Sequence, residues 1–590
     1  LAVIDGPAAG RMAIAEAITN IASAAIDDIS DIRMSANWMA AAGEPGQDGA
    51  LFDTVQTVGM DVCPELGIAI PVGKDSLSMK TVWNDESGER RMRAPVSLII
   101  SAFAPVSDVS KSLTPQINTS CSDSRLLLID LGNGRNRLGG SALAQVYGRF
   151  GEEVPDLDQP SQLKQFFGII QSLNRSGLIR AYHDRSDGGA IATVCEMAFA
   201  GHSGINLSLD VPAKELNSVL FAEEPGAVIQ VAVSDLDEVL ARFDEAGLAS
   251  SLTDLGAPVS SEFLRIECGG EFVLEQSLPQ LQGLWAETSH AIQRLRDNPA
   301  CADQELESVI DWAKPGMQPD VTFDPDDNPA APMIATGARP LMAILREQGV
   351  NGHVEMAAGF DHAGFESVDV HMSDLATGHR SLDEFAGFVA CGGFSYGDVL
   401  GAGRGWANSV LFQQDLREQF GRFLADESKF ALGVCNGCQM LAALKDLVPG
   451  AENWPEFITN RSEQFEARLG TVRIEESPSI FLQGMEGSVL PVATAHGEGR
   501  ARFGPIAPES SLVALRYTSG TGEATEHYPE NPNGSPDGIT GLCNTDGRVT
   551  IMMPHPERTL RSVNFSWAPS RWSDVSPWRR MFLNARRWTG

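Results

Sequence analysis

The chain has 590 residues, and its 44 Lys and Arg against 78 Asp and Glu give a formal net charge of −34. This length exceeds what one hydrophobic core holds, so we expect about three or four domains. The negative charge disfavours a general nucleic-acid or anionic-membrane surface, and no apolar run is long enough to span a membrane. Nine scattered cysteines indicate reduced thiols in a cytoplasmic protein rather than a disulfide framework.

Helical and strand-like patterns alternate through the first half of the chain. Apolar residues at helical spacing predict a helix over residues 7–29, and a second helix is predicted over 51–66. Strands are expected at 68–72, 96–103 and 126–131, and further strand and helix signals follow, including residues 161–176, 189–199 and 235–246. The Ser/Thr-rich segment 107–124 is typical of a joint. We therefore expect two modules, 1–106 and 107–290.

A proline-rich stretch at residues 312–340 predicts a poorly helical linker, taken as 291–339. Four strand candidates, at 341–345, 388–391, 430–434 and 549–553, are separated by helical segments in the third module, 340–590. This order predicts a doubly wound sheet with its site at the carboxyl ends of the strands. The fold class is thus α/β and α+β, in several domains. The last segment, from Ser576, is interpreted as a docked amphipathic helix, with RNA binding as the less favoured alternative.

Cys435 stands at a predicted strand-to-helix turn in Gly433-Val-Cys-Asn-Gly-Cys-Gln. Such an elbow lifts the sulfur from the sheet and directs it toward the positive end of a helix, which favours a thiolate. A second strand leads into Pro-His555-Pro-Glu557, where Glu557 can orient His555 as a base. The alternatives are a core thiol, or a redox or metal pair with Cys438, although no further metal ligands stand nearby. Cysteine, histidine and glutamate in this order resemble the triad of class I glutamine amidotransferases.

Two glycines after another strand, Gly392 and Gly393, are candidates to present amides to a tetrahedral oxyanion together with the amide of Asn436. We assign Gln439 to the same oxyanion and glutamine-binding set. The alternative for Gly392-Gly393 is an ordinary turn. His496 lies in a Gly-rich loop that is either a turn or a substrate-side or domain-coupling element.

Oxygen-bearing side chains in the first half suggest a magnesium and phosphate site. Glu16 and Asn20 lie four residues apart on one helix face, where hard oxygen ligands suit Mg²⁺. Asp184 and Ser186 lie in an acidic loop that could present one to metal and the other to phosphate. Solvated surface contacts and turn chemistry remain the alternatives.

Two further loops have open roles. Gly139 and Gly140 follow a strand and precede a helical segment, so their amides could line an anion, although the spacing matches no standard phosphate motif. Lys74 belongs either to a phosphate-facing loop or to a charged turn.

Six motifs together resemble the large form of phosphoribosylformylglycinamidine synthase, across nearly the whole chain. They are Glu16-Ala-Ile-Thr-Asn-Ile-Ala, Ser35-Ala-Asn-Trp-Met-Ala, Pro71-Val-Gly-Lys-Asp-Ser, His183-Asp-Arg-Ser-Asp-Gly-Gly, Ile344-Leu-Arg-Glu-Gln-Gly-Val-Asn and Gly433-Val-Cys-Asn-Gly-Cys-Gln.

The resemblance implies a ligase that makes formylglycinamidine ribonucleotide from formylglycinamide ribonucleotide, ATP and glutamine in purine biosynthesis. Residues 1 to about 290 resemble the second aminoimidazole-ribonucleotide-synthetase-like half, and 340–590 the class I glutaminase. Carried over by motif position, Cys435, His555 and Glu557 form the triad. Likewise Glu16, Asn20 and Asp184 are Mg²⁺ ligands, and Ser186 lies at an ATP or ADP site that the family uses structurally.

The chain lacks several segments that members of this family contain. The amino-terminal domain, the first synthetase half and the start of the second half, with another metal ligand, are not in it, so we expect a fragment of a protein that is a monomer at full length. Two other readings remain: a related cysteine hydrolase acting on another amide, and a nucleotide-stabilised scaffold without catalysis.

Overall fold

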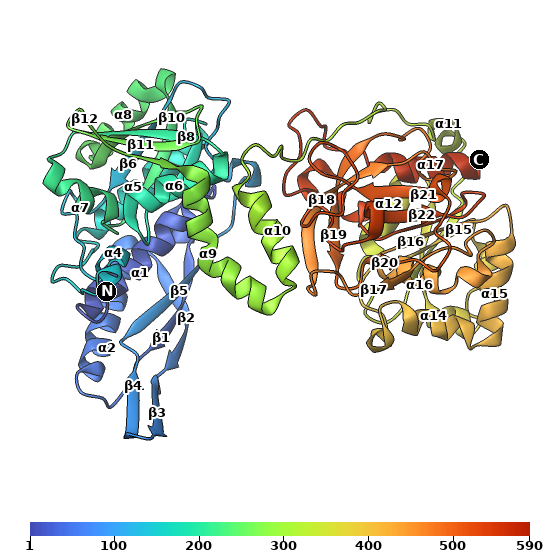
Figure 1. Ribbon diagram of the computed structural model, residues 1–590, viewed down its shortest axis with the longest axis horizontal. Helices are drawn as coiled ribbons and strands as arrows, with labels where there is room; N and C mark the ends of the chain where they lie inside the picture. The colour runs from blue at the N-terminus through green and yellow to red at the C-terminus, as the bar shows by residue number, and fades with distance from the viewer. The chain divides into compact units, whose positions relative to one another are not determined.

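The computed structural model describes residues 1–590, which divide into two compact units, Leu1–Trp285 and Ala286–Gly590 (Figure 1). Each unit has its own hydrophobic core. None of the helices combines the length and apolar character that a membrane crossing needs. All nine cysteines are free thiols.

The first unit contains a three-stranded sheet, ordered β2-β1-β5, and a seven-stranded sheet, ordered β12-β11-β8-β10-β6-β9-β7. Its helices and strands in chain order are α1 (Gly6–Ile21), β1 (Arg33–Met39), α2 (Gln47–Gln56), α3 (Cys63–Leu66), β2 (Ala69–Ser76), β3 (Lys80–Asp85), β4 (Gly88–Arg93), β5 (Ser97–Phe103), β6 (Ser124–Asp130), α4 (Ala142–Val146), α5 (Pro160–Arg175), β7 (Ala181–Asp184), α6 (Gly189–Gly201), β8 (Gly204–Leu209), α7 (Leu216–Phe221), β9 (Gly226–Ala232), α8 (Leu236–Glu245), β10 (Leu252–Val259), β11 (Phe263–Cys268) and β12 (Glu271–Ser277). The boundary between the two units falls within the next helix, α9 (Leu278–Arg296).

The first helix is shorter than predicted. It begins after Asp5, whose carboxylate accepts a hydrogen bond from the amide of Ala8 at 2.8 Å, and it ends at Ile21 rather than at residue 29. Ile26 and Ile29 nevertheless lie in the same core, reached by irregular backbone. The apolar spacing therefore predicted correctly that Ile26 and Ile29 are buried, but it wrongly predicted that the helix continues to them.

The second unit is built on a nine-stranded sheet, ordered β14-β13-β15-β16-β23-β22-β21-β18-β19. Its helices and strands are α10 (Pro299–Ile310), α11 (Ala331–Ala335), β13 (Leu341–Arg346), α12 (His353–His362), β14 (Glu366–His371), α13 (Met372–Ala376), β15 (Gly387–Ala390), α14 (Arg404–Leu411), α15 (Gln414–Ala425), β16 (Phe430–Val434), α16 (Asn436–Ala443), β17 (Glu456–Ile458), β18 (Glu466–Ile474), β19 (Val489–His496), β20 (Arg500–Arg502), β21 (Val513–Tyr517), β22 (Ile539–Cys543), β23 (Val549–Met552) and α17 (Arg579–Thr589).

Five of these strands, β14, β13, β15, β16 and β23, are parallel, and the remaining four extend the sheet as antiparallel strands. Four of the parallel strands, β13, β15, β16 and β23, are nearly continuous apolar runs, as is typical of strands covered on both faces. The edge strand β14 instead alternates apolar and polar residues. The four strand ranges predicted for this module correspond to β13, β15, β16 and β23. Because the carboxyl ends of parallel strands meet at one edge, β15, β16 and β23 all end on the same side of the sheet.

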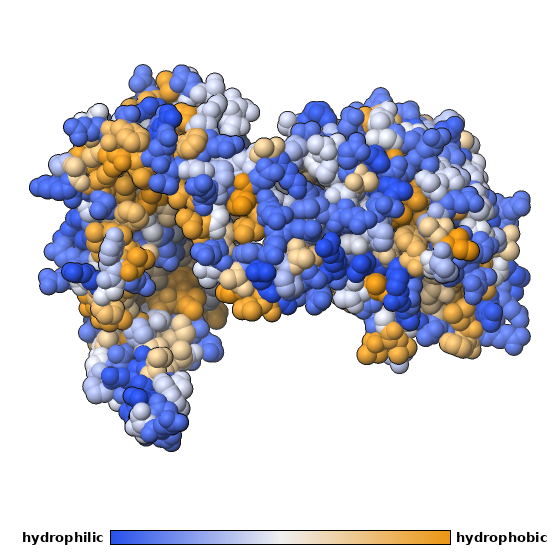
Figure 2. Space-filling model, in the orientation of Figure 1, coloured by the Kyte–Doolittle hydropathy of each residue, from blue (hydrophilic) through white to orange (hydrophobic).

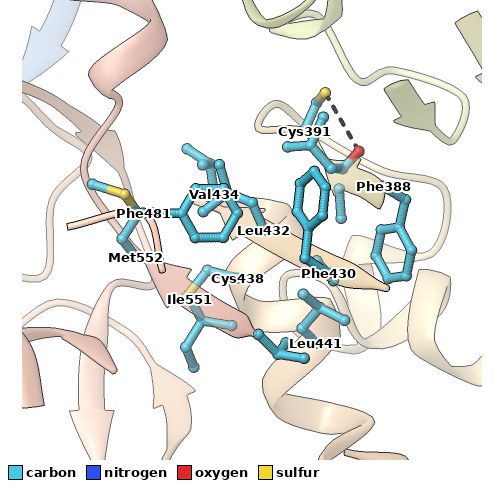
Figure 3. Close-up of a cluster of buried hydrophobic side chains, with 14 of the residues drawn as sticks. Phe388, Cys391, Phe430, Leu432, Val434, Cys438, Leu441, Phe481, Ile551 and Met552 are labelled. Carbon is cyan, nitrogen blue, oxygen red and sulfur yellow. Dashed lines mark hydrogen bonds between the residues drawn. The ribbon is translucent and has the colours of Figure 1, made fainter. Parts of the chain in front are cut away.

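Figure 3 shows part of the core of the second unit, which packs along the central strands β15, β16 and β23. Phe388, Phe430 and Phe481 pack among aliphatic side chains of the central strands, with ring centroids of Phe430 and Phe481 5.7 Å apart. Residues 291–339, expected as a linker, contain α10 and α11 together with the irregular segment between them.

Candidate functional site

Cys435 occupies a sharp turn between β16 and α16, with φ 52° and ψ −110°. A non-glycine residue rarely adopts a positive φ, so the surrounding packing must hold it there. The amide of Cys435 donates to the carbonyl of Met552 on β23 at 2.9 Å. A Cβ atom on Gly437 would lie 2.0 Å from the carbonyl oxygen of Ala390, so glycine is required for α16 to begin this close to β15.

His555 and Glu557 follow β23 and are both buried. His555 Nδ1 lies 2.6 Å from Glu557 Oε1, and the His555 amide donates to the carbonyl of Ala493 at 2.8 Å. A Cβ atom placed on Gly392 would lie 2.5 Å from His555 Cε1 and 3.2 Å from Cys435 Cβ. The imidazole and the thiol-bearing residue therefore both contact Gly392, at the end of β15.

The environment of His555 favours its protonated form. Burial alone lowers the pKa, but the charge of Glu557, the nearby Cys435 sulfur and the hydrogen bond to Glu557 raise it to about 10, from an ordinary value of 6.5. His555 Nε2 has no hydrogen-bond partner, and the Cys435 thiol instead donates to the carbonyl of Ala495 at 3.6 Å. An imidazolium paired with Glu557 is the protonation state that a cysteine hydrolase needs before attack.

The other thiols near this edge lack that environment. Cys438, one turn along α16, and Cys391, after β15, are fully buried among apolar side chains (Figure 3), and burial raises the pKa of each thiol well above its usual range. Neither is suited to nucleophilic attack at neutral pH.

The remaining residues of the expected oxyanion and glutamine-binding set surround the elbow. Gly393 has φ 133°, and the carbonyl of Gly392 accepts from the amides of Asn351 and Gly352 at 3.3 and 3.1 Å. Asn436 is the first residue of α16, and the Gln439 side-chain amide donates to the carbonyl of Glu498.

A pocket of about 430 Å³ opens over Cys435. Its rim carries Phe394 and Phe465, both largely exposed, with ring centroids 6.2 Å apart. More exposed apolar side chains follow Phe394 on the loop before α14, where Figure 2 shows an apolar cluster. The pocket lining is Asn351, Gly393, Phe394, Asp398, Ala402, Cys435, Asn436, Gln439, Phe465, Ala467, Ala495, His496, Gly497, Glu498 and Arg558.

His496 ends β19 beside this pocket and is 3% exposed, with neither ring nitrogen hydrogen-bonded. Burial and the nearby His555 lower its pKa to about 3, so the ring is neutral at physiological pH. Gly499 lies against the ring, since a Cβ atom there would come within 2.3 Å of it. His496 is therefore a fixed neutral part of the pocket wall.

In the first unit, Glu16 and Asn20 project from α1 toward the end of β7. Asn20 Nδ2 lies 3.5 Å from Asp184 Oδ1. Burial raises the pKa of Glu16, and the negative charges of Asp187, Asp184 and Glu223 add to the increase. No three carboxylate, histidine or cysteine side chains converge as a ready metal-binding group. The oxygen donors nonetheless suit Mg²⁺, because a divalent cation would relieve their mutual repulsion.

Sequence reasoning missed Asp187 and Glu223 in this cluster. Glu223 Oε1 accepts from the amides of Ala142 and Gly188 at 2.8 and 2.9 Å, so it links the loops that precede α4 and α6. Asp187 lies next to Ser186 in the loop after β7. From the sequence, an ordinary Asp-Gly-Gly turn explained this aspartate as well as a role in the site did. The only sequence signal for Glu223 was its acidic character, because the two amides it binds lie 81 and 35 residues away.

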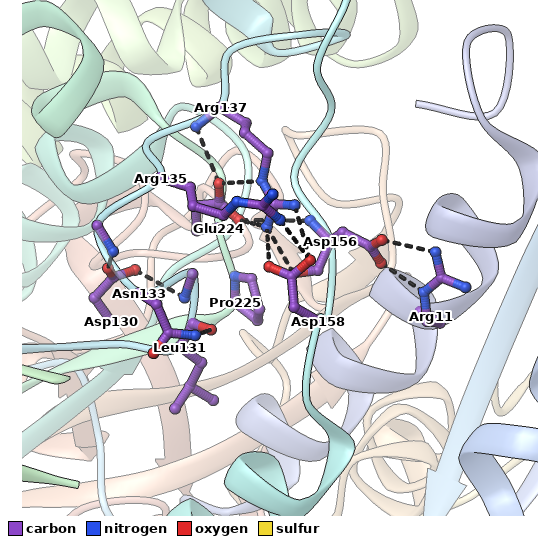
Figure 4. A network of polar contacts seen from close by, with 12 residues as sticks. Arg11, Asp130, Leu131, Asn133, Arg135, Arg137, Asp156, Asp158, Glu224 and Pro225 are labelled. Carbon is purple, nitrogen blue, oxygen red and sulfur yellow. Dashed lines mark hydrogen bonds and ion pairs between the residues drawn. The ribbon is translucent and has the colours of Figure 1, made fainter.

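The glycine-rich loop after β6 is organised by the chain's own carboxylates (Figure 4). Asp130 accepts from the amides of Gly132 and Gly134 at 3.1 and 2.7 Å, and Glu224 forms a buried pair with Arg137 at 2.7 Å.

The amides of Gly139 and Gly140 are also already paired. They donate to the carbonyls of Glu153 and Phe150 at 2.7 and 2.6 Å, so they do not line an anion. Lys74 lies within β2 rather than in a loop, with Nζ 3.0 Å from Ser76 Oγ.

Three protein-family models match the chain. Residues 339–589 match a CobB/CobQ-like glutamine amidotransferase domain, and residues 124–257 match the C-terminal domain of AIR synthase related proteins. Residues 1–105 match the FGAR-AT PurM_N-like domain. Together these are the domains of phosphoribosylformylglycinamidine synthase, a glutamine amidotransferase ligase, in an α/β and α+β arrangement.

Three solved structures of low sequence identity are similar to parts of this chain. A chain of PurLQS from Thermotoga maritima is 23% identical over 42% of this chain and 98% of its own, with a TM-score of 0.32. T. maritima PurL complexed with ATP is 12% identical over 47% of this chain, with a TM-score of 0.34, and only 41% of that PurL chain is covered. Escherichia coli HypE, a hydrogenase maturation protein, is 20% identical over 45% of this chain and 78% of its own, with a TM-score of 0.32.

Proposed function

We propose that this chain supplies the glutaminase half-reaction in the ATP-dependent conversion of formylglycinamide ribonucleotide and glutamine to formylglycinamidine ribonucleotide and glutamate. The observation that carries the proposal is the meeting of Cys435 and the His555–Glu557 pair over Gly392, beneath a pocket of about 430 Å³. The three domain matches supply the substrate class.

In the proposed mechanism the Cys435 sulfur attacks the side-chain amide carbon of glutamine, and the carbonyl becomes a tetrahedral oxyanion. The amides of Gly393 and Asn436 are the proposed donors to that oxygen. His555, held by Glu557, gives its proton to the departing nitrogen, so ammonia leaves and a glutamyl thioester remains. His555 then takes a proton from water, which attacks the thioester and releases glutamate and the thiolate.

For the first unit we propose an auxiliary magnesium–nucleotide site. Glu16, Asn20 and Asp184 would hold Mg²⁺, and Ser186 would contact the phosphates of ATP or ADP. The mutual repulsion of the carboxylates around Glu16 supports this assignment. When bound, Mg²⁺ supplies positive charge to the phosphates. In this proposal the nucleotide stabilises the unit and does not react.

The whole-protein context is also a proposal. Ammonia formed at Cys435 would pass internally to a synthetase site where ATP activates formylglycinamide ribonucleotide, because transfer through the protein protects ammonia from protonation in water. We further propose that the intact enzyme is a cytoplasmic monomer.

The decisive experiment compares Cys435→Ala with Cys438→Ala for glutamate release from glutamine and for labelling by a glutamine-directed alkylating analogue. We expect Cys435→Ala to abolish both and Cys438→Ala to retain both within about threefold. Equal loss in the two variants would disprove the choice of nucleophile. Hydrolysis of other amides without analogue labelling would instead indicate a different cysteine hydrolase.

A further inference from the structure

Asp398 is the centre of a compact hydrogen-bond network on the loop between β15 and α14. Its Oδ1 accepts from Ser395 Oγ at 2.8 Å and from the amide of Gly403 at 3.0 Å. Its Oδ2 accepts from the amide of Ser395 at 2.7 Å and from Asn436 Nδ2 at 2.9 Å. All four partners are donors, so the carboxylate acts only as an acceptor.

This network determines the orientation of the Asn436 side chain. Because Asp398 can only accept, the NH2 group of Asn436 must face it, and Oδ1 must face the opposite way. Asn436 is 1% exposed, and Oδ1 has no hydrogen-bond partner in the protein. A buried acceptor without a partner is unusual and calls for an explanation.

The position of Asn436 suggests the missing partner. The residue follows Cys435 directly and lines the same pocket, together with the charged side chains of Glu498 and Arg558. Glutamine carries two N–H donors, the side-chain carboxamide and the α-ammonium group, and either matches a fixed carbonyl acceptor.

We propose that Asn436 Oδ1 accepts a hydrogen bond from an N–H group of bound glutamine, and that Asp398 is the positioning residue that holds this acceptor in place. The inference deepens the proposed function and rests on it. Asn436 is thereby a specificity residue, which favours glutamine over a ligand that has an oxygen, or nothing, where glutamine has the N–H group.

The test measures binding by calorimetry to the full chain carrying Cys435→Ala, so that glutamine is not consumed. Three ligands are compared: glutamine; glutamate, which lacks the carboxamide N–H; and glutaramate, which lacks the α-ammonium group. Asn436→Ala removes the acceptor. Asp398→Asn leaves Asn436 in place but allows its amide to turn over. Asn408→Ala, which removes a partly buried amide from α14, is the matched control.

We expect Asn436→Ala to reduce the preference for glutamine over one of the two other ligands by about tenfold, which identifies the N–H group that is bound. Asp398→Asn should shift the same preference in the same direction, and Asn408→Ala should change neither. Proportional weakening of all three ligands in both variants would overturn the inference while leaving the proposed function standing. Absence of glutamine binding to the Cys435→Ala protein itself would reject the proposed function, and the inference with it.

Discussion

At the scale of single residues, the two histidines near the elbow have pKa values shifted in opposite directions. His555 is hydrogen-bonded to Glu557 and lies near the Cys435 sulfur, and its pKa is raised to about 10. His496 has no carboxylate partner and is repelled by His555, and its pKa is lowered to about 3. Two buried imidazoles in one site thus hold opposite protonation states at neutral pH, and only His555 carries the extra proton that the departing nitrogen needs in the proposed mechanism.

This assignment predicts the alkaline limit of the reaction. Because the pKa of His555 in the folded protein is raised above 6.5, the imidazolium and its favourable pairing persist at neutral pH and are lost only as pH rises through about 10. We expect the rate of glutamine hydrolysis to fall on the alkaline side near pH 10. The measurement is kcat for glutamate release from about pH 6 to about pH 11.

Replacement of Glu557 tests whether its carboxylate is what raises the pKa of His555. Glu557→Gln removes the largest influence that raises the pKa of His555, so the alkaline limb should move toward neutral pH and kcat at pH 7 should fall by roughly 100-fold. An unmoved alkaline limb in this variant would show that Glu557 does not control His555.

At the scale of elements, the elbow depends on glycine where α16 starts. In Gly437→Ala the new Cβ would meet the carbonyl oxygen of Ala390 at 2.0 Å, so α16 must move away from β15 and displace Cys435. We expect a loss of about 1–3 kcal/mol in the free energy of unfolding of the second unit and a fall in glutaminase activity of about 100-fold.

Gly421 provides the matched control, because it lies in α15 with open space around its Cβ position. Gly421→Ala should stabilise that helix by about 0.5–1 kcal/mol and leave activity unchanged. Chemical denaturation and glutamate release distinguish the two variants. Normal activity in Gly437→Ala would mean that the elbow tolerates the shift.

The C-terminal helix α17 is docked through an arginine. Arg586 is fully buried and donates to the carbonyls of Gly364, Met333, Ala338 and Gly590. Arg586→Ala removes a fully buried side chain together with the charged donor to four carbonyls, so we expect a loss of about 3 kcal/mol in stability. Arg587→Ala removes an exposed arginine from the next position and should cost under about 0.5 kcal/mol. Comparable losses in both variants, measured by urea unfolding, would contradict the docking role.

Long apolar runs and turn motifs made much of this fold predictable. The sequence located β13, β15, β16 and β23, because buried parallel strands are continuous in apolar residues. It missed the antiparallel extension by β18, β19, β21 and β22, whose pairing follows from contacts between distant segments. Asp398 and Glu223 were missed for the same reason. Their partners, Asn436 and the amides of Ala142 and Gly188, are 35 or more residues away in sequence.

At the scale of the whole molecule, two units with separate cores carry two kinds of chemistry. The second unit places its site where three parallel strands end, and there Glu557 lies beside the protonated His555. The first unit instead concentrates negative charge, with Glu16 near Asp184, Asp187 and Glu223. Such repulsion opposes folding unless a cation offsets it, so this unit should respond to metal and nucleotide while the second unit does not.

The final prediction tests this difference with Glu16→Gln. Without ligand, the variant should raise the melting temperature of the first unit, because it removes one of several mutually repelling charges. Mg²⁺ with ADP at 100 times its dissociation constant should stabilise the wild-type unit by about 2.7 kcal/mol and the variant by much less. Differential scanning calorimetry follows both, and the transition of the second unit is the internal control. Equal stabilisation of wild type and variant by Mg²⁺ and ADP would remove Glu16 from the site, because a ligand of the metal cannot be lost without weakening its binding.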